Sequence, residues 1–81
     1  MLLDRFDKNA VVTGRKQTVR AVKEGKAKFV FVARDAAPML ADEISEICAQ
    51  AGIEVRYADS MVQLGHAAGI AVGASTCAVL K

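Results

Sequence analysis

Apolar residues recur along this chain at two spacings, and each spacing predicts a different kind of element. Between Pro38 and Ala51 they return at every third or fourth position, which is typical of a helix with one buried face. Proline suits the first position of a helix because it has no amide hydrogen to leave unpaired, and Gly52 suits the residue that ends one. Asp42 and Glu43 follow near the N-terminus of this helix, which is the end that carries partial positive charge. We therefore predict a helix from Pro38 to about Ala51.

Two shorter helices are predicted on either side of it. The first covers residues 15–24, with Gly25 as its stop signal. The second covers residues 61–68. It is preceded by Ser60, and Gln63 follows Ser60 three residues later, which is the signature of a capping box at a helix start.

Four segments have the apolar pattern of strands. The most apolar one, residues 28–33, runs with hardly a break, as expected of a central strand that is covered on both faces. Residues 53–57 alternate between apolar and polar side chains, which indicates a strand with one buried face. The remaining two strands are predicted over residues 10–13, ended by Gly14, and over residues 75–80.

Strands and helices alternate along the chain with connections of only a few residues. Such alternation places helices on both faces of a single sheet. We therefore predict an α/β fold, a three-layer α/β/α sandwich around a small mixed four-stranded sheet. A chain of 81 residues leaves no room for a second domain, so residues 1–81 are predicted to form one domain.

Composition predicts a core of aliphatic side chains. Apolar residues make up 53% of the chain, but it has three Phe, one Tyr and no Trp. Near the beginning, Leu2, Leu3 and Phe6 indicate a short amphipathic turn or helix, and charges interrupt this segment before a secretory signal could form. The two cysteines, Cys48 and Cys77, share no metal-ligand spacing. We predict that both are reduced core residues of a cytoplasmic protein without membrane contact.

Positive charge is concentrated in one part of the sequence. The formal net charge is +2, yet the segment from Arg15 to Lys28 holds six basic residues and a single acid, Glu24. That segment therefore carries +5, and the rest of the chain carries −3. This asymmetry points to a negatively charged partner.

The start of the first predicted helix carries the most unusual charges. A helix start has partial positive charge and unpaired amide donors, so it favours Asp or Glu. Arg15 and Lys16 occupy the first turn instead, and Arg20 follows Lys16 on the same face, where like charges repel by about 0.2–0.5 kcal/mol. One interpretation is an ordinary solvated face. The other is a site for a polyanion, and it requires the three side chains to share a direction and to be free of carboxylates of the same molecule.

A second candidate contact is the glycine-flanked loop of residues 69–73. It contains the apolar residues Ile70 and Val72 between a predicted helix and a predicted strand. These two side chains either pack into the core or form a platform against which an unstacked base can rest.

Three motifs stand in one order along the chain: Gly14–Arg20 followed by Gly25, then Ala33–Pro38, then Leu64–Ala74. In residues and spacing they resemble the kink-turn-binding ribosomal protein family, the large-subunit seven-Ae and thirty-e group, and above all its short bacterial members. The similarity covers nearly the whole chain. It implies an α/β/α sandwich that recognises kink-turns, which are sharply bent RNA duplexes with tandem sheared G·A pairs.

The resemblance also implies which residues contact RNA. By position, Lys16 stands where Asn is common in the family, Gln17 where Glu is common, and Arg20 at the basic position one turn later. Lys16 and Gln17 can still donate to guanine O6 and N7, but with a different hydrogen-bond pattern. The family's apolar loop, which packs on extruded bases, falls on residues 70–72. The predicted RNA-binding residues are Gly14, Arg15, Lys16, Gln17, Arg20, Ile70, Ala71, Val72 and Gly73.

Together with the change at Lys16 and Gln17, two further departures from the family predict weaker or more permissive binding. Gly73 replaces a proline often found in the loop, so the platform should be more mobile. Basic residues that many relatives carry are missing near Met61 and Val62.

We therefore predict a non-catalytic protein that binds structured RNA with a kink-turn, either ribosomal RNA or a riboswitch, that associates with the ribosome and that is a monomer. The alternative is a protein-interaction adaptor of the same fold with secondary RNA contact. Catalysis is not expected, because the single histidine, His66, has no partner for acid–base or metal chemistry. No glycine-rich phosphate loop of Rossmann or Walker type occurs either, and we predict no metal and no cofactor.

Overall fold

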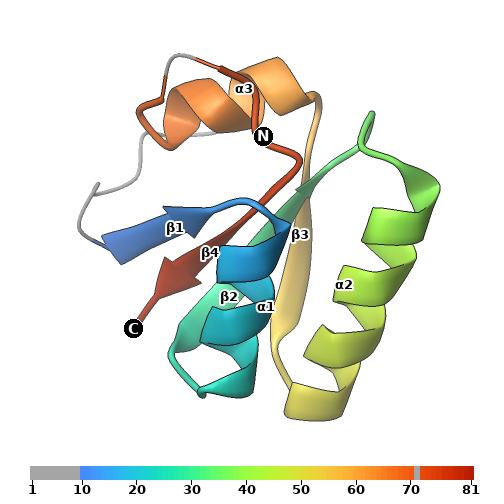
Figure 1. The fold of residues 1–81 in the computed structure, drawn as a ribbon, viewed down its shortest axis with the longest axis vertical. Coiled ribbons are helices and arrows are strands. Elements are labelled where there is room, and N and C mark those ends of the chain that lie inside the picture. The colour runs from blue at the N-terminus through green and yellow to red at the C-terminus, as the bar shows by residue number, and fades with distance from the viewer. Residues whose placement is uncertain (1–9, 71) are drawn as a thin grey trace.

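Within the described part of the chain, four strands form one mixed sheet. They are β1 (Val11–Thr13), β2 (Ala27–Ala33), β3 (Glu54–Ala58) and β4 (Thr76–Leu80). The structure, a computed structural model, describes residues 10–70 and 72–81, and its sheet has the order β1–β4–β2–β3 (Figure 1). β2 and β3 are parallel, whereas β4 runs antiparallel to both of its neighbours, β1 and β2.

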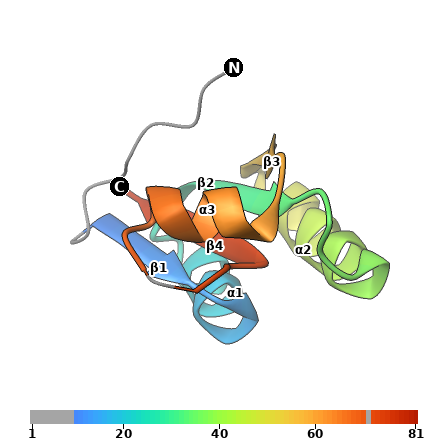
Figure 2. The same cartoon turned by 90° about the horizontal axis from the view of Figure 1, so that it is seen from above.

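Three helices in the described part of the chain cover the two faces of this sheet. They are α1 (Arg15–Lys23), α2 (Pro38–Ala51) and α3 (Met61–Ala67). α1 and α2 lie on one face and α3 lies on the other (Figure 2). The three-layer arrangement and the mixed sheet are confirmed, and every helix and strand begins and ends within one residue of its predicted bounds.

The central strand β2 is apolar on both sides because it separates two cores. Successive side chains of a strand point to opposite faces. Val30 and Val32 pack into the core under α1 and α2, which includes Ile44. Phe31 points the other way and packs with Leu64 of α3. The unbroken apolar run in the sequence therefore corresponds to a strand that is buried on both faces, as predicted.

The start of α3 is fixed by two side chains. The Gln63 amide donates to Oγ of Ser60 at 3.1 Å, which is the cap that the sequence predicts. The Met61 amide donates to Oδ1 of Asp35 at 2.7 Å. Because Asp35 follows β2, this second bond ties the start of α3 to the turn between β2 and α2.

All three helices begin at the same end of the sheet. β1, β2 and β3 run in one direction, and each is followed by a helix. β4 runs in the opposite direction, so residues 72–75, which precede it, reach that end as well. We call this the helix-start end. In open α/β sheets, ligand sites commonly lie beyond the carboxyl ends of the strands, which is where this end lies.

Within residues 10–70 and 72–81, no helix has the length and apolar character needed to cross a membrane. The amphipathic turn predicted around Leu2, Leu3 and Phe6 lies outside the described residues.

Candidate nucleic-acid interface

The turn from β1 into α1 depends on Gly14. Its φ is +93° and its ψ is 156°, a conformation that L-residues with side chains rarely adopt. A Cβ at this position would meet nothing within 4 Å, so backbone conformation and not crowding requires glycine. The Gly14 amide donates to the Thr76 carbonyl at 2.9 Å, and the Gly14 carbonyl accepts from the Thr18 amide at 3.0 Å. These bonds hold the start of α1 beside the beginning of β4.

The first turn of α1 offers unpaired backbone donors. The amides of the first helical residues have no acceptor one turn earlier in the helix. Within residues 10–70 and 72–81 no side chain caps them, and the first turn contains no acidic residue. The amides of Arg15, Lys16 and Gln17 therefore precede the first helical hydrogen bond, which the Thr18 amide makes. Such a turn attracts an anion, because its N–H groups and the helix dipole both favour negative charge.

The side chains of this turn lie at the surface, as predicted. Arg15, Lys16 and Gln17 are exposed, and so is Arg20 one turn later, whereas Thr18 is buried. Among the described residues, Lys16 has no carboxylate within ion-pair distance. Lys16 and Gln17 thus present polar groups to solvent directly beside the unpaired amides.

Arg15 is paired with a residue of another helix. Its Nε donates to Oε1 of Glu43 at 2.6 Å, and its Nη2 donates to Oε2 of the same carboxylate at 2.5 Å. The hydrogen bond from Arg15 lowers the pKa of the Glu43 carboxyl, and Glu43 raises the pKa of Arg15 in the same way. The expectation that the cations of this helix start are free of carboxylates is therefore wrong for Arg15.

Arg20 is paired as well. Its Nε lies 3.2 Å from Oε2 of Glu24, and the other oxygen of this carboxylate lies 3.3 Å from Nζ of Lys26. The hydrogen bond from Arg20 is the main cause that lowers the pKa of Glu24. The expectation of a free cation is wrong here too, so the predicted condition of three free cations is not met: among the described residues only Lys16 of the three has no carboxylate partner. The Arg15 and Arg20 side chains are nevertheless 57% and 72% exposed, and exposed ion pairs are weak enough to exchange partners.

The second candidate contact rests on α3. The Ile70 amide donates to the Gly65 carbonyl at 3.0 Å, and the Ala74 amide donates to the Met61 carbonyl at 3.0 Å. A Cβ on Gly65 would lie 2.1 Å from the carbonyl oxygen of Val72, so only glycine lets this loop lie against the helix.

The apolar side chains of this loop reach the surface. Ile70 is 37% exposed and Val72 is 71% exposed, and Gly73 is exposed beside them. Neither apolar side chain is therefore fully withdrawn into the core, which is what contact with a base requires. Ala71 was also predicted as a contact, and it lies outside the described residues. Residues 72–75 and the start of α1 both lie at the helix-start end, so the structure brings the two predicted contacts to one side of the molecule.

Both cysteines pack in the interior, as predicted. Cys48 belongs to the core under α1 and α2, and Cys77 to the core under α3. Burial raises the pKa of the Cys77 thiol to about 12 and also raises that of Cys48. A thiol that stays protonated at neutral pH is a poor nucleophile and a poor metal ligand.

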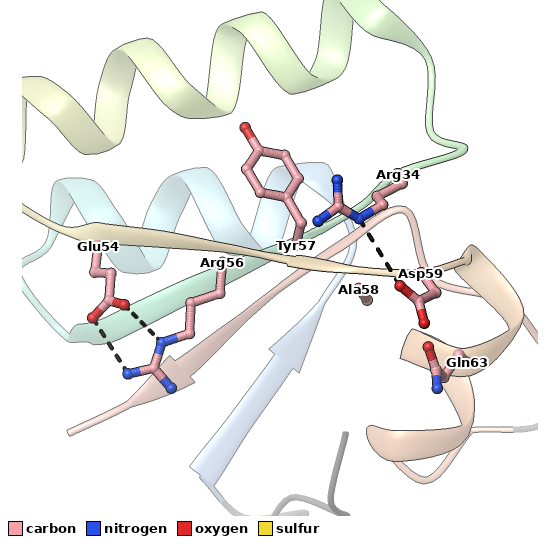
Figure 3. A pocket seen from close by; sticks show the side chains of 7 residues that line it. All are labelled: Arg34, Glu54, Arg56, Tyr57, Ala58, Asp59 and Gln63. Atoms are coloured by element: carbon pink, nitrogen blue, oxygen red, sulfur yellow. Dashed lines mark hydrogen bonds and ion pairs between the residues drawn. The ribbon is translucent and has the colours of Figure 1, made fainter. Parts of the chain in front are cut away.

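A separate hollow lies along β3, one of the two edge strands of the described sheet. Its volume is about 380 Å³. Figure 3 shows its charged side chains paired with one another: Arg56 with Glu54, and Arg34 with Asp59. Arg34 also lies over the ring of Tyr57, 5.4 Å from its centre. These charges offset one another, and none of the predicted site residues that the structure describes lines this hollow.

Comparison with known proteins identifies the group to which these features belong. Residues 3–81 match the model of the Ribosomal protein L7Ae/L30e/S12e/Gadd45 family. The chain belongs to this family. The resemblance stated from its three motifs is thereby confirmed, and the match covers the elements that carry both predicted contacts.

Curated relatives and solved structures agree with this membership. A protein of Geobacillus sp. (strain WCH70) named RNA-binding protein is 49% identical over 70 residues, which are 86% of this chain and 85% of that protein. The large ribosomal subunit protein eL8 of Halobacterium salinarum (strain ATCC 29341 / DSM 671 / R1) is 37% identical over 75 residues, 91% of this chain and 62% of that protein. The solved structure titled Giardia lamblia 15.5kD RNA binding protein has a TM-score of 0.84 and 26% identity, and the match covers 90% of this chain and 62% of that one. The names of these relatives describe binding and ribosomal proteins, in agreement with the prediction that the chain is not an enzyme.

Proposed function

We propose that this member of the family is an RNA-binding protein that recognises kink-turn RNA and catalyses no reaction. One observation carries the proposal: the start of α1 is uncapped, free of acids and held open by Gly14, and it presents Lys16 and Gln17 beside unpaired amides. Relatives with the name RNA-binding protein support RNA as the polyanion.

The proposed contacts divide into two kinds. Lys16 and Gln17 contact base edges of the sheared G·A pairs, because both side chains can donate to guanine O6 and N7. The unpaired amides, Arg15 and Arg20 contact phosphates, which fix the position of the helix but carry no sequence information.

The loop gives the second part of the interface. Ile70 and Val72, with Ala71 between them, rest against a base that has left the stack, since single unstacked bases are the parts of an RNA that apolar surfaces can cover. Gly73 is exposed beside them and completes the proposed contact, and its missing side chain lets the loop lie close to Met61 of α3. A protein that contacts the RNA duplex and the unstacked base together binds the bent RNA more tightly than the extended form. Binding therefore shifts the RNA toward the bent form.

The wider setting is part of the same proposal. The likeness to a large ribosomal subunit protein supports association with the ribosome, and free buried cysteines fit a cytoplasmic location. We propose that residues 1–81 act as one domain and as a monomer.

An electrophoretic mobility shift assay tests the proposal. A kink-turn duplex is compared with a matched duplex in which Watson–Crick pairs replace the sheared G·A pairs, at several salt concentrations. We expect preference for the kink-turn, and a slope of log affinity on log salt of about −2 to −3, which corresponds to three cationic contacts. Equal binding to both duplexes contradicts kink-turn recognition, and the absence of binding to either contradicts RNA binding.

A further inference from the structure

The Arg15–Glu43 ion pair joins the first residue of α1 to the second turn of α2 at the helix-start end. Both oxygens of Glu43 accept from two nitrogens on one side of the guanidinium. This two-pronged geometry is the one in which arginine binds a phosphate group. In the free protein, therefore, the carboxylate occupies the side of Arg15 that could receive an RNA phosphate in the same way.

The pair is neutral as a unit and accessible. A phosphate that approaches it meets the carboxylate as well as the guanidinium, and two anions at such short range repel. The two side chains are 57% and 37% exposed, and they line a hollow of about 650 Å³ together with Ala37, Met39 and Leu40. There is space beside the pair for Arg15 to turn away from Glu43.

We propose that Glu43 limits RNA affinity by competing with RNA phosphate for Arg15. The inference rests on the proposed function and adds a residue that sets the affinity for RNA. Phosphate binding by Arg15 then requires an exchange, in which the guanidinium leaves one carboxylate and gains one phosphate. Lys23 is the other cation whose charge acts on Glu43, so the carboxylate keeps a favourable neighbour after the exchange.

The test compares Glu43→Gln with Glu46→Gln in the full chain. Glu46 is an exposed acid of the same helix that has no ion pair within the described residues, so its variant removes the same charge without touching Arg15. The dissociation constant for the kink-turn duplex is measured by fluorescence anisotropy at low and at high salt. We expect Glu43→Gln to bind about two- to fivefold more tightly at low salt, which corresponds to an exposed ion pair.

Measurements at high salt and in a variant that lacks the Arg15 side chain make the test specific. High salt screens the Arg15–Glu43 pair as well, so the gain from Glu43→Gln should shrink as salt rises. In an Arg15→Ala background, Glu43→Gln should give no more than the change seen for Glu46→Gln. Circular dichroism checks that the variants stay folded.

The outcomes separate this inference from the function on which it rests. Weaker binding by Glu43→Gln would mean that Glu43 positions Arg15 for RNA, and it would overturn the inference. A gain that persists without Arg15, or no gain at all, would overturn it too while leaving RNA binding intact. If the wild-type chain binds no RNA, the proposed function fails first and this inference fails with it.

Discussion

Lys16 is the cation of the first α1 turn that no described carboxylate neutralises. Arg15 and Arg20 both share their charge with an acid, whereas Lys16 keeps its full charge beside unpaired amides that are themselves partly positive. An anion bound at this turn would therefore gain more from Lys16 than from either arginine. Gln17, next to it, adds donor and acceptor groups without charge.

Charge reversal at Lys16 gives a direct prediction. Lys16→Glu should weaken binding to kink-turn RNA by tenfold or more, because it replaces a donor to guanine O6 and N7 by a carboxylate, which can only accept. Folding should be unchanged, since the side chain is exposed. Lys28→Glu is the matched control: it makes the same change in net charge at an exposed residue of β2, near the end of that strand opposite the helix-start end. Equal losses in the two variants, measured by anisotropy, would show a general charge effect and no site at the start of α1.

Each arginine pairs with a different acid, and only one of the two ion pairs could be predicted from the sequence. Arg20 and Glu24 are four residues apart, a spacing that brings two side chains together on one helix, so the pair could have been predicted. Arg15 and Glu43 are 28 residues apart. No local pattern connects them, because the contact exists only where α1 and α2 pack side by side.

At the scale of elements, α3 and the loop that follows it behave as one unit. The loop lies against the helix through backbone bonds to Gly65 and Met61, and a side chain at position 65 would collide with the Val72 carbonyl. The sequence shows a glycine in the middle of a helix, where it costs about 1 kcal/mol relative to alanine. The structure gives the reason for that cost: a close approach between helix and loop.

Gly65→Ala tests this reason. Helix propensity alone predicts a more stable protein, whereas the collision predicts a loss of about 1–3 kcal/mol, because the loop must move. We expect the loss, together with weaker RNA binding through Ile70 and Val72. Urea unfolding measures the free energy of unfolding. His66→Ala, at the next and exposed position of α3, is the control and should change it by less than about 0.5 kcal/mol. A stabilised Gly65→Ala variant would contradict the proposed close approach.

At the scale of the whole molecule, stability depends on two small cores on either side of a four-stranded sheet. Each core contains one cysteine, and Cys77 is completely buried with Phe31 and Leu64. The thiol has a pKa of about 12 in the folded state, against 9.0 for an ordinary thiol. The folded protein therefore holds a proton that the unfolded chain releases at lower pH.

The protein should therefore become less stable at high pH. Below pH 9, the raised pKa of Cys77 does not change the free energy of unfolding. As pH rises from about 9 to 12, it lowers this free energy by up to about 1.4 kcal/mol per pH unit. Urea unfolding at pH 8.5 and 10.5 measures this change for the wild type and for Cys77→Ala. We expect a smaller decrease in the variant, because it lacks the Cys77 thiol and is otherwise the same chain. Equal decreases would contradict the assignment to Cys77.

The sequence by itself determined the elements, their order and the residues at the surface of α1. Hydrophobic spacing, the Ser60–Gln63 cap and the glycine stops are local signals, and local backbone geometry converts them directly into helices and strands. The membership of the family could be read in the same way, because its motifs are continuous stretches of sequence. Apart from the local Arg20–Glu24 pair, only the tertiary structure decided which charges are free. It placed Glu43 beside Arg15, left Lys16 unpaired among the described residues and brought the loop before β4 to the start of α1. These contacts join residues far apart in the chain, and packing of whole elements against the sheet creates them.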